Sequence, residues 1–155
     1  SEHFAFMPQF YKDAKEGTLP AYAFIEPRLA YNHNDFHPPF GVYRSSEVDG
    51  RLVIDSAVSD VRAGEKLVAS VYDAIRTSAS SAGSNAMNTL LLITFDEHGG
   101  TYDHVPPPRA VPPVEGAAPG EMGFAFDRLG GRVPAIAVSA YTRAGTVIND
   151  EMHHG

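Results

Sequence analysis

The sequence contains no cysteine, and it has fewer cationic than acidic side chains. Without cysteine, disulfides and thiolate metal sites are excluded. Twelve Lys and Arg residues against nineteen Asp and Glu residues give a formal charge of -7, which disfavours sequence-independent binding to nucleic acid or to anionic lipid. No run of eighteen apolar residues and no basic leader followed by a short apolar core occurs, so this chain predicts neither a transmembrane segment nor a signal peptide.

What the sequence does contain is enough apolar residues for one domain. Of the 155 residues, 43% are hydrophobic, which is sufficient for a globular unit with a core. Apolar spacing predicts a helix that starts near Pro8 and stops at Gly17, and a second helix from Asp60 to Thr77. Apolar runs bounded by turn residues predict strands at 21–26, 51–55, 89–95 and 133–140.

The remaining segments are predicted to be irregular. Residues 31–60 are rich in Asn, Asp, Pro, Ser and Gly around the one short strand, and residues 77–88 are predicted to form a flexible connector. Residues 105–131 carry much of the proline and glycine and are predicted to be a surface excursion. No internal repeat and no second domain is visible.

The run Thr89 to Phe95 is apolar almost throughout, which suits a central parallel strand that is covered on both faces. Strands separated by helices or long crossovers favour an α/β layer architecture with a mostly parallel sheet. In such sheets, ligand sites lie beyond the carboxyl ends of the strands.

The sequence DEHGG stands at such a strand end. Asp96 and Glu97 repel each other if both are ionised, and Gly99 and Gly100 free the backbone to direct both carboxylates to one point, where a divalent cation would compensate them. His98 and His104 add nitrogen ligands or proton carriers. The ordinary alternative is a turn whose acidic residues cap a helix.

Histidines also occur in two other polar segments. His37 lies in NDFHPP, two residues after Asp35 and before Pro38, while His153 and His154 lie near the last residue. The prolines bias this loop toward an extended conformation, and Phe36 can anchor it in the core. The alternative is that these histidines satisfy backbone carbonyls or belong to a solvated tail.

Four segments in this order, NDFHPP, DVRAGEKLV, TLLLITFDEHGGTYDHVPPP and RVPAIAVSAYTRAGTVI, resemble the phosphoesterase family of bacterial and plant non-specific phospholipases C and acid phosphatases. The resemblance implies an alkaline phosphatase-like fold, export to a secreted or periplasmic location, and metal-assisted hydrolysis of phosphate esters. It implies that Asp96 and Glu97 bind the metal and that His37 faces the phosphate. The resemblance also implies that His154 corresponds to the histidine of a terminal His-x-Ser motif, whose serine position lies beyond Gly155.

Two departures from the family pattern limit this reading. This sequence has no counterpart of the family's early Glu-Asn pair or of the segment with its Ser or Thr nucleophile. Residues 1–155 are therefore interpreted as the carboxyl-proximal part of one catalytic domain, with the remaining part of that domain as a partner. The link FGVYRSSEVDGRLVIDSAVS is longer than usual and is expected to shape substrate access.

The predicted function is therefore hydrolysis of a phosphate ester or phospholipid, with His37 and His98 as candidate catalytic residues. His98 and His104 can instead orient the carboxylates, and Asp35, His104 and His154 are candidates for substrate binding or support of the site. Oxygen ligands suit Ca, Mg or Mn, whereas an added imidazole favours Zn or Fe. The alternatives are a sulfatase-like hydrolase, a metal-stabilised binding module without turnover, and an interaction protein that uses the loop 31–43.

Overall fold

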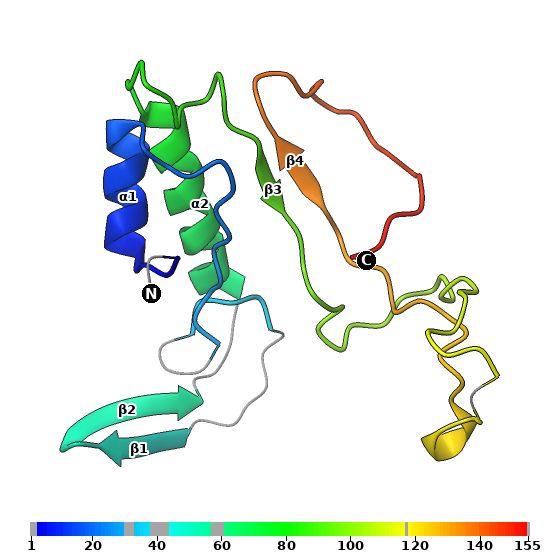
Figure 1. Ribbon diagram of the computed structural model, residues 1–155. Helices are drawn as coiled ribbons and strands as arrows, with labels where there is room; N and C mark the ends of the chain where they lie inside the picture. The colour runs from blue at the N-terminus through cyan, green and yellow to red at the C-terminus, as the bar shows by residue number, and fades with distance from the viewer. Residues whose placement is uncertain (1–2, 30–32, 38–43, 57–60, 117, 155) are drawn as a thin grey trace. The chain divides into compact units, whose positions relative to one another are not determined.

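The computed structural model describes residues 3–29, 33–37, 44–56, 61–116 and 118–154. Its elements follow the order α1, β1, β2, α2, β3, a 3-10 helix η1, and β4 (Figure 1). The chain divides into two compact units, one of residues 1–92 with 137–152 and one of residues 93–136 with 153–155. Within the described residues, none of the helices is long and apolar enough to span a bilayer.

Helix α1, Met7–Glu16, is the helix predicted around Pro8. Pro8 stands in its first turn, where a missing N–H costs nothing because that group has no partner in the helix. Gly17 ends it in the left-handed conformation at φ 80°, and its N–H donates to the carbonyl of Asp13 at 2.8 Å. A residue with a Cβ is strained at this φ, so glycine is what allows the helix to stop here.

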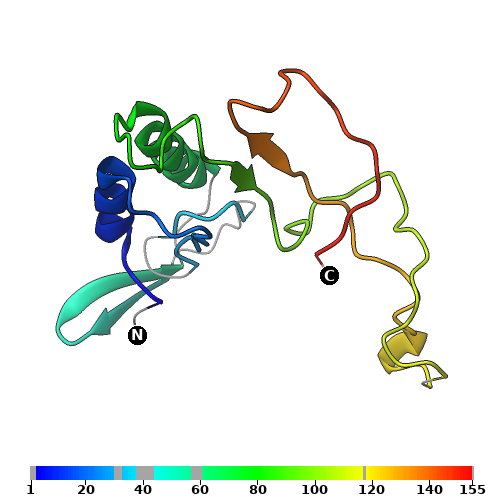
Figure 2. The same cartoon turned by 45° about the horizontal axis from the view of Figure 1, so that its top comes forward.

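Helix α2, Val61–Thr77, confirms the second predicted helix, although its expected cap Asp60 lies outside the described residues. It packs beside α1, as both ribbon views show (Figures 1 and 2). Ala14 of α1 and Val71 and Ile75 of α2 are the buried apolar side chains of the described part. The four-residue spacing of Val71 and Ile75 places them on one face of α2, which explains this small core.

The segment after α2 is attached to α1 and is not the loose connector that its composition predicted. The hydroxyl of Ser78 donates to the carbonyl of Ala14 at 2.7 Å, and that of Ser80 donates to the carbonyl of Glu16 at 3.1 Å. The N–H of Leu19 donates to the hydroxyl of the buried Ser84 at 3.0 Å. Serine hydroxyls therefore satisfy the last carbonyls of α1, which have no partners within the helix.

Strands β1, Arg44–Val48, and β2, Arg51–Ser56, form an antiparallel hairpin. The sequence predicted β2 but treated β1 as loop, which is wrong. The turn between them is Asp49-Gly50, with φ of 51° and 71°. Asp-Gly is a preferred pair for a two-residue hairpin turn with both residues at positive φ, so this signal was present in the sequence.

Strands β3, Leu91–Ile93, and β4, Ile136–Val138, pair with each other and run in opposite directions (Figure 1). Both are shorter than the runs predicted at 89–95 and 133–140, and residues 21–26 form no strand. The pairings within the described residues are antiparallel, so the expected parallel sheet is not seen there. Leu92 is 59% exposed whereas Leu91 and Ile93 are half-buried, so one apolar face of β3 is uncovered in the described part.

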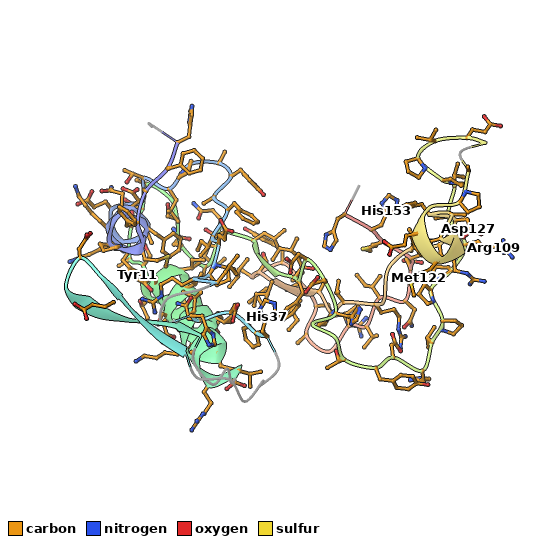
Figure 3. All side chains as sticks on the ribbon, turned by 90° about the horizontal axis from the view of Figure 1, so that it is seen from below. Tyr11, His37, Arg109, Met122, Asp127 and His153 are labelled. Atoms are coloured by element: carbon orange, nitrogen blue, oxygen red, sulfur yellow. The ribbon has the colours of Figure 1, made fainter. Side chains whose placement is uncertain are left out.

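The second unit contains the proline-rich excursion that the sequence placed on the surface. Arg109 and Arg128 form an isolated antiparallel bridge, and the N–H of Leu129 donates to the carbonyl of Pro108 at 3.0 Å. Beyond this bridge lies η1, Glu121–Gly123. The guanidinium of Arg109 lies 3.5 Å from the carboxylate of Asp127, and both side chains are labelled in Figure 3. The described side chains of the excursion are largely exposed, as predicted.

Candidate functional site

The segment 33–37 carries a carboxylate between two imidazoles. Asp35 is only 6% exposed, and its Oδ2 lies 2.7 Å from Nδ1 of His37. Its Oδ1 lies 3.0 Å from Nδ1 of His33. The side chain of His33 is 9% exposed and that of His37 is 48% exposed, so the two rings differ in their access to solvent.

Two local contacts explain why this segment adopts its conformation. The carboxamide oxygen of Asn34 accepts the N–H of Arg28 at 2.7 Å, and the N–H of Asn34 donates to the carbonyl of Arg28 at 3.1 Å. Phe36 packs against Gly64 of α2, where a Cβ would lie 2.5 Å from Cε2 of the phenyl ring. Phe36 therefore holds this loop against α2, but its side chain is half-buried and does not enter the core as predicted. Pro38 and Pro39 lie outside the described residues.

This geometry determines which ring nitrogens carry protons. An ionised carboxylate accepts hydrogen bonds and donates none, so each Nδ1 that faces Asp35 must be protonated. With Nδ1 of His37 protonated, Nε2 is an acceptor in the neutral ring and a second donor in the imidazolium. His37 can therefore bind an anionic oxygen or transfer a proton through Nε2.

The acidic pair follows β3 after Thr94 and Phe95, two residues that the sequence had included in the strand. Asp96 and Glu97 are both exposed, and the N–H of Glu97 donates to Oδ1 of Asp96 at 3.1 Å. A turn follows at Gly99 and Gly100, with φ of 63° and 77°. Backbone of this kind allows the chain to reverse directly after the pair, so both carboxylates stay at the strand end.

His98 rests on glycine backbone in the same unit. A Cβ on Gly131 would lie 2.9 Å from Cδ2 of His98, so the imidazole packs where only a residue without a side chain fits. The carbonyl of His98 accepts the N–H of Thr101 at 3.2 Å and also the hydroxyl of Thr101. These contacts hold His98 in a fixed position beside the acidic turn. A residue that carries protons there, or that orients the turn, needs such a fixed position.

Asp103 and Arg132 form a two-pronged ion pair near His104. Nε and Nη2 of Arg132 donate to the two carboxylate oxygens of Asp103 at 2.7 and 2.8 Å, and the N–H of Val105 donates to Oδ1 at 3.0 Å. The hydrogen bond from Arg132, followed by that from Val105, holds the pKa of Asp103 well below its ordinary value. His104 lies 3.8 Å from Asp103 with 83% of its side chain exposed, so it stands at the surface of this pair.

The predicted site residues thus fall into two groups. Asp35 and His37 belong to the first unit and contact each other, whereas the others belong to the second unit: Asp96, Glu97, His98, His104 and the exposed His154. That the two groups form one site stays a prediction. His33 was missed, although its position two residues before Asp35, with His37 two residues after, is the spacing that puts side chains of extended chain on one side.

The acidic pair fits a divalent ion as part of its shell. Two exposed carboxylates offer the hard oxygen donors that Ca, Mg and Mn prefer, but Ca takes roughly six to eight such ligands. Across the described residues, no three His, Asp or Glu side chains come close enough together to hold a metal. Asp96 and Glu97 would therefore supply only some of the ligands.

The family model described as the Phosphoesterase family matches residues 2–155. The chain belongs to this family. The resemblance that NDFHPP and DEHGG indicated is thus confirmed, and the phosphoesterase motifs fall on the two groups of side chains described above.

Curated members of the phosphoesterase family are similar to nearly the whole chain. Non-specific phospholipase C4 of Arabidopsis thaliana is 42% identical over 147 residues, which are 91% of this chain and 23% of the relative. Non-specific phospholipase C6 of the same plant is 40% identical over 148 residues, 92% of this chain and 24% of the relative. Phospholipase C A of Mycobacterium tuberculosis is 38% identical over 76 residues, 43% of this chain and 15% of the relative. The chain spans about a quarter of the length of the plant relatives, and no solved structure matches it significantly.

Proposed function

We propose that the protein hydrolyses phosphate esters and that its substrates include phospholipids cleaved as by a phospholipase C. The observation that carries this proposal is His37, whose Nδ1 is held by a buried carboxylate in a member of the Phosphoesterase family. The relatives named non-specific phospholipase C support the substrate class.

His37 is proposed to act on the phosphoryl group or on the leaving group. Because Asp35 holds Nδ1, the orientation of the ring is set before substrate arrives, and little conformational freedom remains to be lost on binding. As a neutral ring, His37 accepts a hydrogen bond at Nε2. As an imidazolium, it donates one to a nonbridging oxygen or delivers a proton to the departing alkoxide.

Asp96 and Glu97 are proposed to hold a divalent ion together with further ligands. Such an ion, when bound, neutralises phosphoryl oxygens and lowers the pKa of a coordinated hydroxyl group. The carboxylates would keep the ion at the end of β3, and His98, packed on Gly131, would orient the turn that carries them.

The wider arrangement is also a proposal from the resemblance. An alkaline phosphatase-like sheet, sandwiched between helices, would place the end of β3 at the edge where ligand sites collect in such folds. Export to a secreted or periplasmic location is proposed on the same ground. Recovery of the native protein in the periplasmic fraction or in the culture supernatant would support this location.

The test uses His37→Ala in the full-length protein, with the exposed His3→Ala as the matched histidine control. Turnover by His37→Ala should fall by roughly two to four orders of magnitude, the usual contribution of a general acid or base, while His3→Ala stays near wild type. If His37 protonates the leaving group, an alkyl phosphate should suffer more than nitrophenyl phosphate, because nitrophenolate leaves without a proton. If it binds phosphoryl oxygen, both substrates should suffer alike.

Substrate class is tested in parallel with nitrophenyl phosphate, phosphatidylcholine and nitrophenyl sulfate. Hydrolysis of the two phosphate esters supports the proposal. Faster hydrolysis of the sulfate would instead favour a sulfatase-like enzyme, and no turnover of any of the three would favour a binding module.

A further inference from the structure

His33 is the second histidine on the carboxylate of Asp35. Asp35 uses one oxygen for Nδ1 of His37 at 2.7 Å and the other for Nδ1 of His33 at 3.0 Å. Asp35 is 6% exposed, so water does little to solvate either oxygen. The stability of this carboxylate therefore depends on protein donors, and His33 supplies one of them.

We propose that His33 is a positioning residue for His37, which acts through Asp35 to hold the ring of His37 in its working orientation. The proposal rests on the proposed function, in which His37 acts on the phosphate ester. In this role His33 does not contact the substrate.

The reason is the freedom of an aspartate side chain. Rotation about the last torsion of Asp is broad and roughly two-fold, so a single hydrogen bond leaves the carboxylate plane poorly defined. A donor on each oxygen fixes that plane. The direction from which Asp35 accepts the hydrogen bond of His37 Nδ1 is then fixed too. The ring orientation of His37 follows, as it does for ligands whose supporting hydrogen bonds set their geometry.

A purely structural role for His33 is disfavoured by the other contacts of the segment. Asn34 already exchanges two hydrogen bonds with Arg28, and Phe36 already packs on Gly64. These contacts hold the backbone of the segment from both sides of Asp35. What they do not supply is a donor to Oδ1 of Asp35, which is the specific contribution of His33.

The experiment compares two substitutions of His33 in the full-length protein. His33→Phe keeps a flat ring but removes the Nδ1 donor, whereas His33→Asn places an amide N–H near the position of Nδ1. We expect His33→Phe to lower kcat for an alkyl phosphate by about 10- to 100-fold with little change in KM, as loss of a supporting hydrogen bond does. His33→Asn should stay within about threefold of wild type. His33→Gln, whose amide lies one bond further from the backbone, replaces His33→Phe if that variant does not fold, with the same expected loss.

A spectroscopic signature is measured on the same proteins. Selective ¹⁵N-histidine labelling, with the His37 signals assigned by their loss in His37→Ala, should show Nδ1 protonated in wild type and in His33→Asn. In His33→Phe the two tautomers of His37 should be mixed. This readout does not need turnover, so it separates the inference from the proposed function.

Two results would overturn the inference. One is equal turnover by His33→Phe and His33→Asn, whether both are active or both are impaired. The other is an unchanged His37 tautomer in His33→Phe. If the tautomer shifts as expected but wild type hydrolyses no phosphate ester, the positioning role stands and the proposed function fails.

Discussion

Gly64 provides a way to move His37 without touching any group that contacts substrate. It lies in the first turns of α2, and the loop that carries Asp35 and His37 packs directly on it. A Cβ at this position would lie 2.5 Å from Cε2 and 2.6 Å from Cδ2 of Phe36, and 2.8 Å from the carbonyl oxygen of Asp35. Gly64→Ala must therefore displace the loop.

The size of the effect follows from these distances. Carbon atoms in contact are separated by about 3.5–4.0 Å, so the ring of Phe36 has to move by about 1 Å. Overpacking of this kind costs about 1–3 kcal/mol, while alanine gains about 0.5–1 kcal/mol over glycine inside a helix. We expect a net loss of stability of about 1–2 kcal/mol. A misplacement of about 1 Å at a catalytic group can cost about 100-fold in rate, which is the expected fall in kcat.

The assay measures kcat and Tm of full-length Gly64→Ala. Gly130→Ala is the matched control, because nothing lies within 4 Å of a Cβ there. Adding Phe36→Leu to Gly64→Ala should restore part of the activity, since the smaller side chain relieves the contact. A Gly64→Ala enzyme with higher Tm and kcat within about threefold of wild type would refute the coupling between this packing and the site.

Two further predictions concern the second unit. Asp96→Asn should lower the amount of divalent metal that elemental analysis finds after dialysis. Tm should change little, because Asp96 is exposed and an asparagine oxygen can still accept the N–H of Glu97. Unchanged metal content would contradict the role of Asp96 as a ligand. Arg132 holds the pKa of Asp103 below its ordinary value of about 3.9, so the pair should stabilise the fold fully above about pH 4 and lose this effect as the pH falls further. Urea unfolding should then show a steeper acid loss for wild type than for Asp103→Asn, and parallel profiles below pH 4 would count against it.

Local physical signals explain which parts of the fold were predictable. Gly17 ends α1 because its backbone takes the left-handed conformation, and Val71 and Ile75 mark the buried face of α2 by their spacing. Asp49-Gly50 is an equally local signal, and β1 was missed because the composition of residues 31–60 outweighed it. The serines after α2 suggested flexibility, yet their hydroxyls find the carbonyls at the end of α1.

The site residues that the sequence predicted are likewise those with local signals. The sequence placed Asp96 and Glu97 beyond a strand and named Asp35 and His37 as candidates, since strand ends and short polar motifs are local features. It did not predict the hydrogen bond between Asp35 and His37. His33 was overlooked although its two-residue spacing from Asp35 is a local signal, because that spacing indicates a shared carboxylate only when the backbone conformation is known. Contacts such as that of His98 with Gly131 join residues far apart in the chain, and one sequence contains no pattern that predicts them.

Strand formation shows where local signals stop being sufficient. Residues 21–26 have the apolar composition of a strand but form none, and β3 and β4 pair over three residues each while Leu92 and Ile136 stay exposed. A strand, unlike a helix, makes its hydrogen bonds with another segment, and its apolar faces stabilise it only when other elements cover them. Since the plant relatives are about four times as long as the matched region, we expect further segments of the full-length protein to pair with these runs. Hydrogen exchange would show this as slow amides across residues 89–95 in the full-length protein and fast amides at the ends of that run in residues 1–155 alone, and equal exchange in both would contradict it.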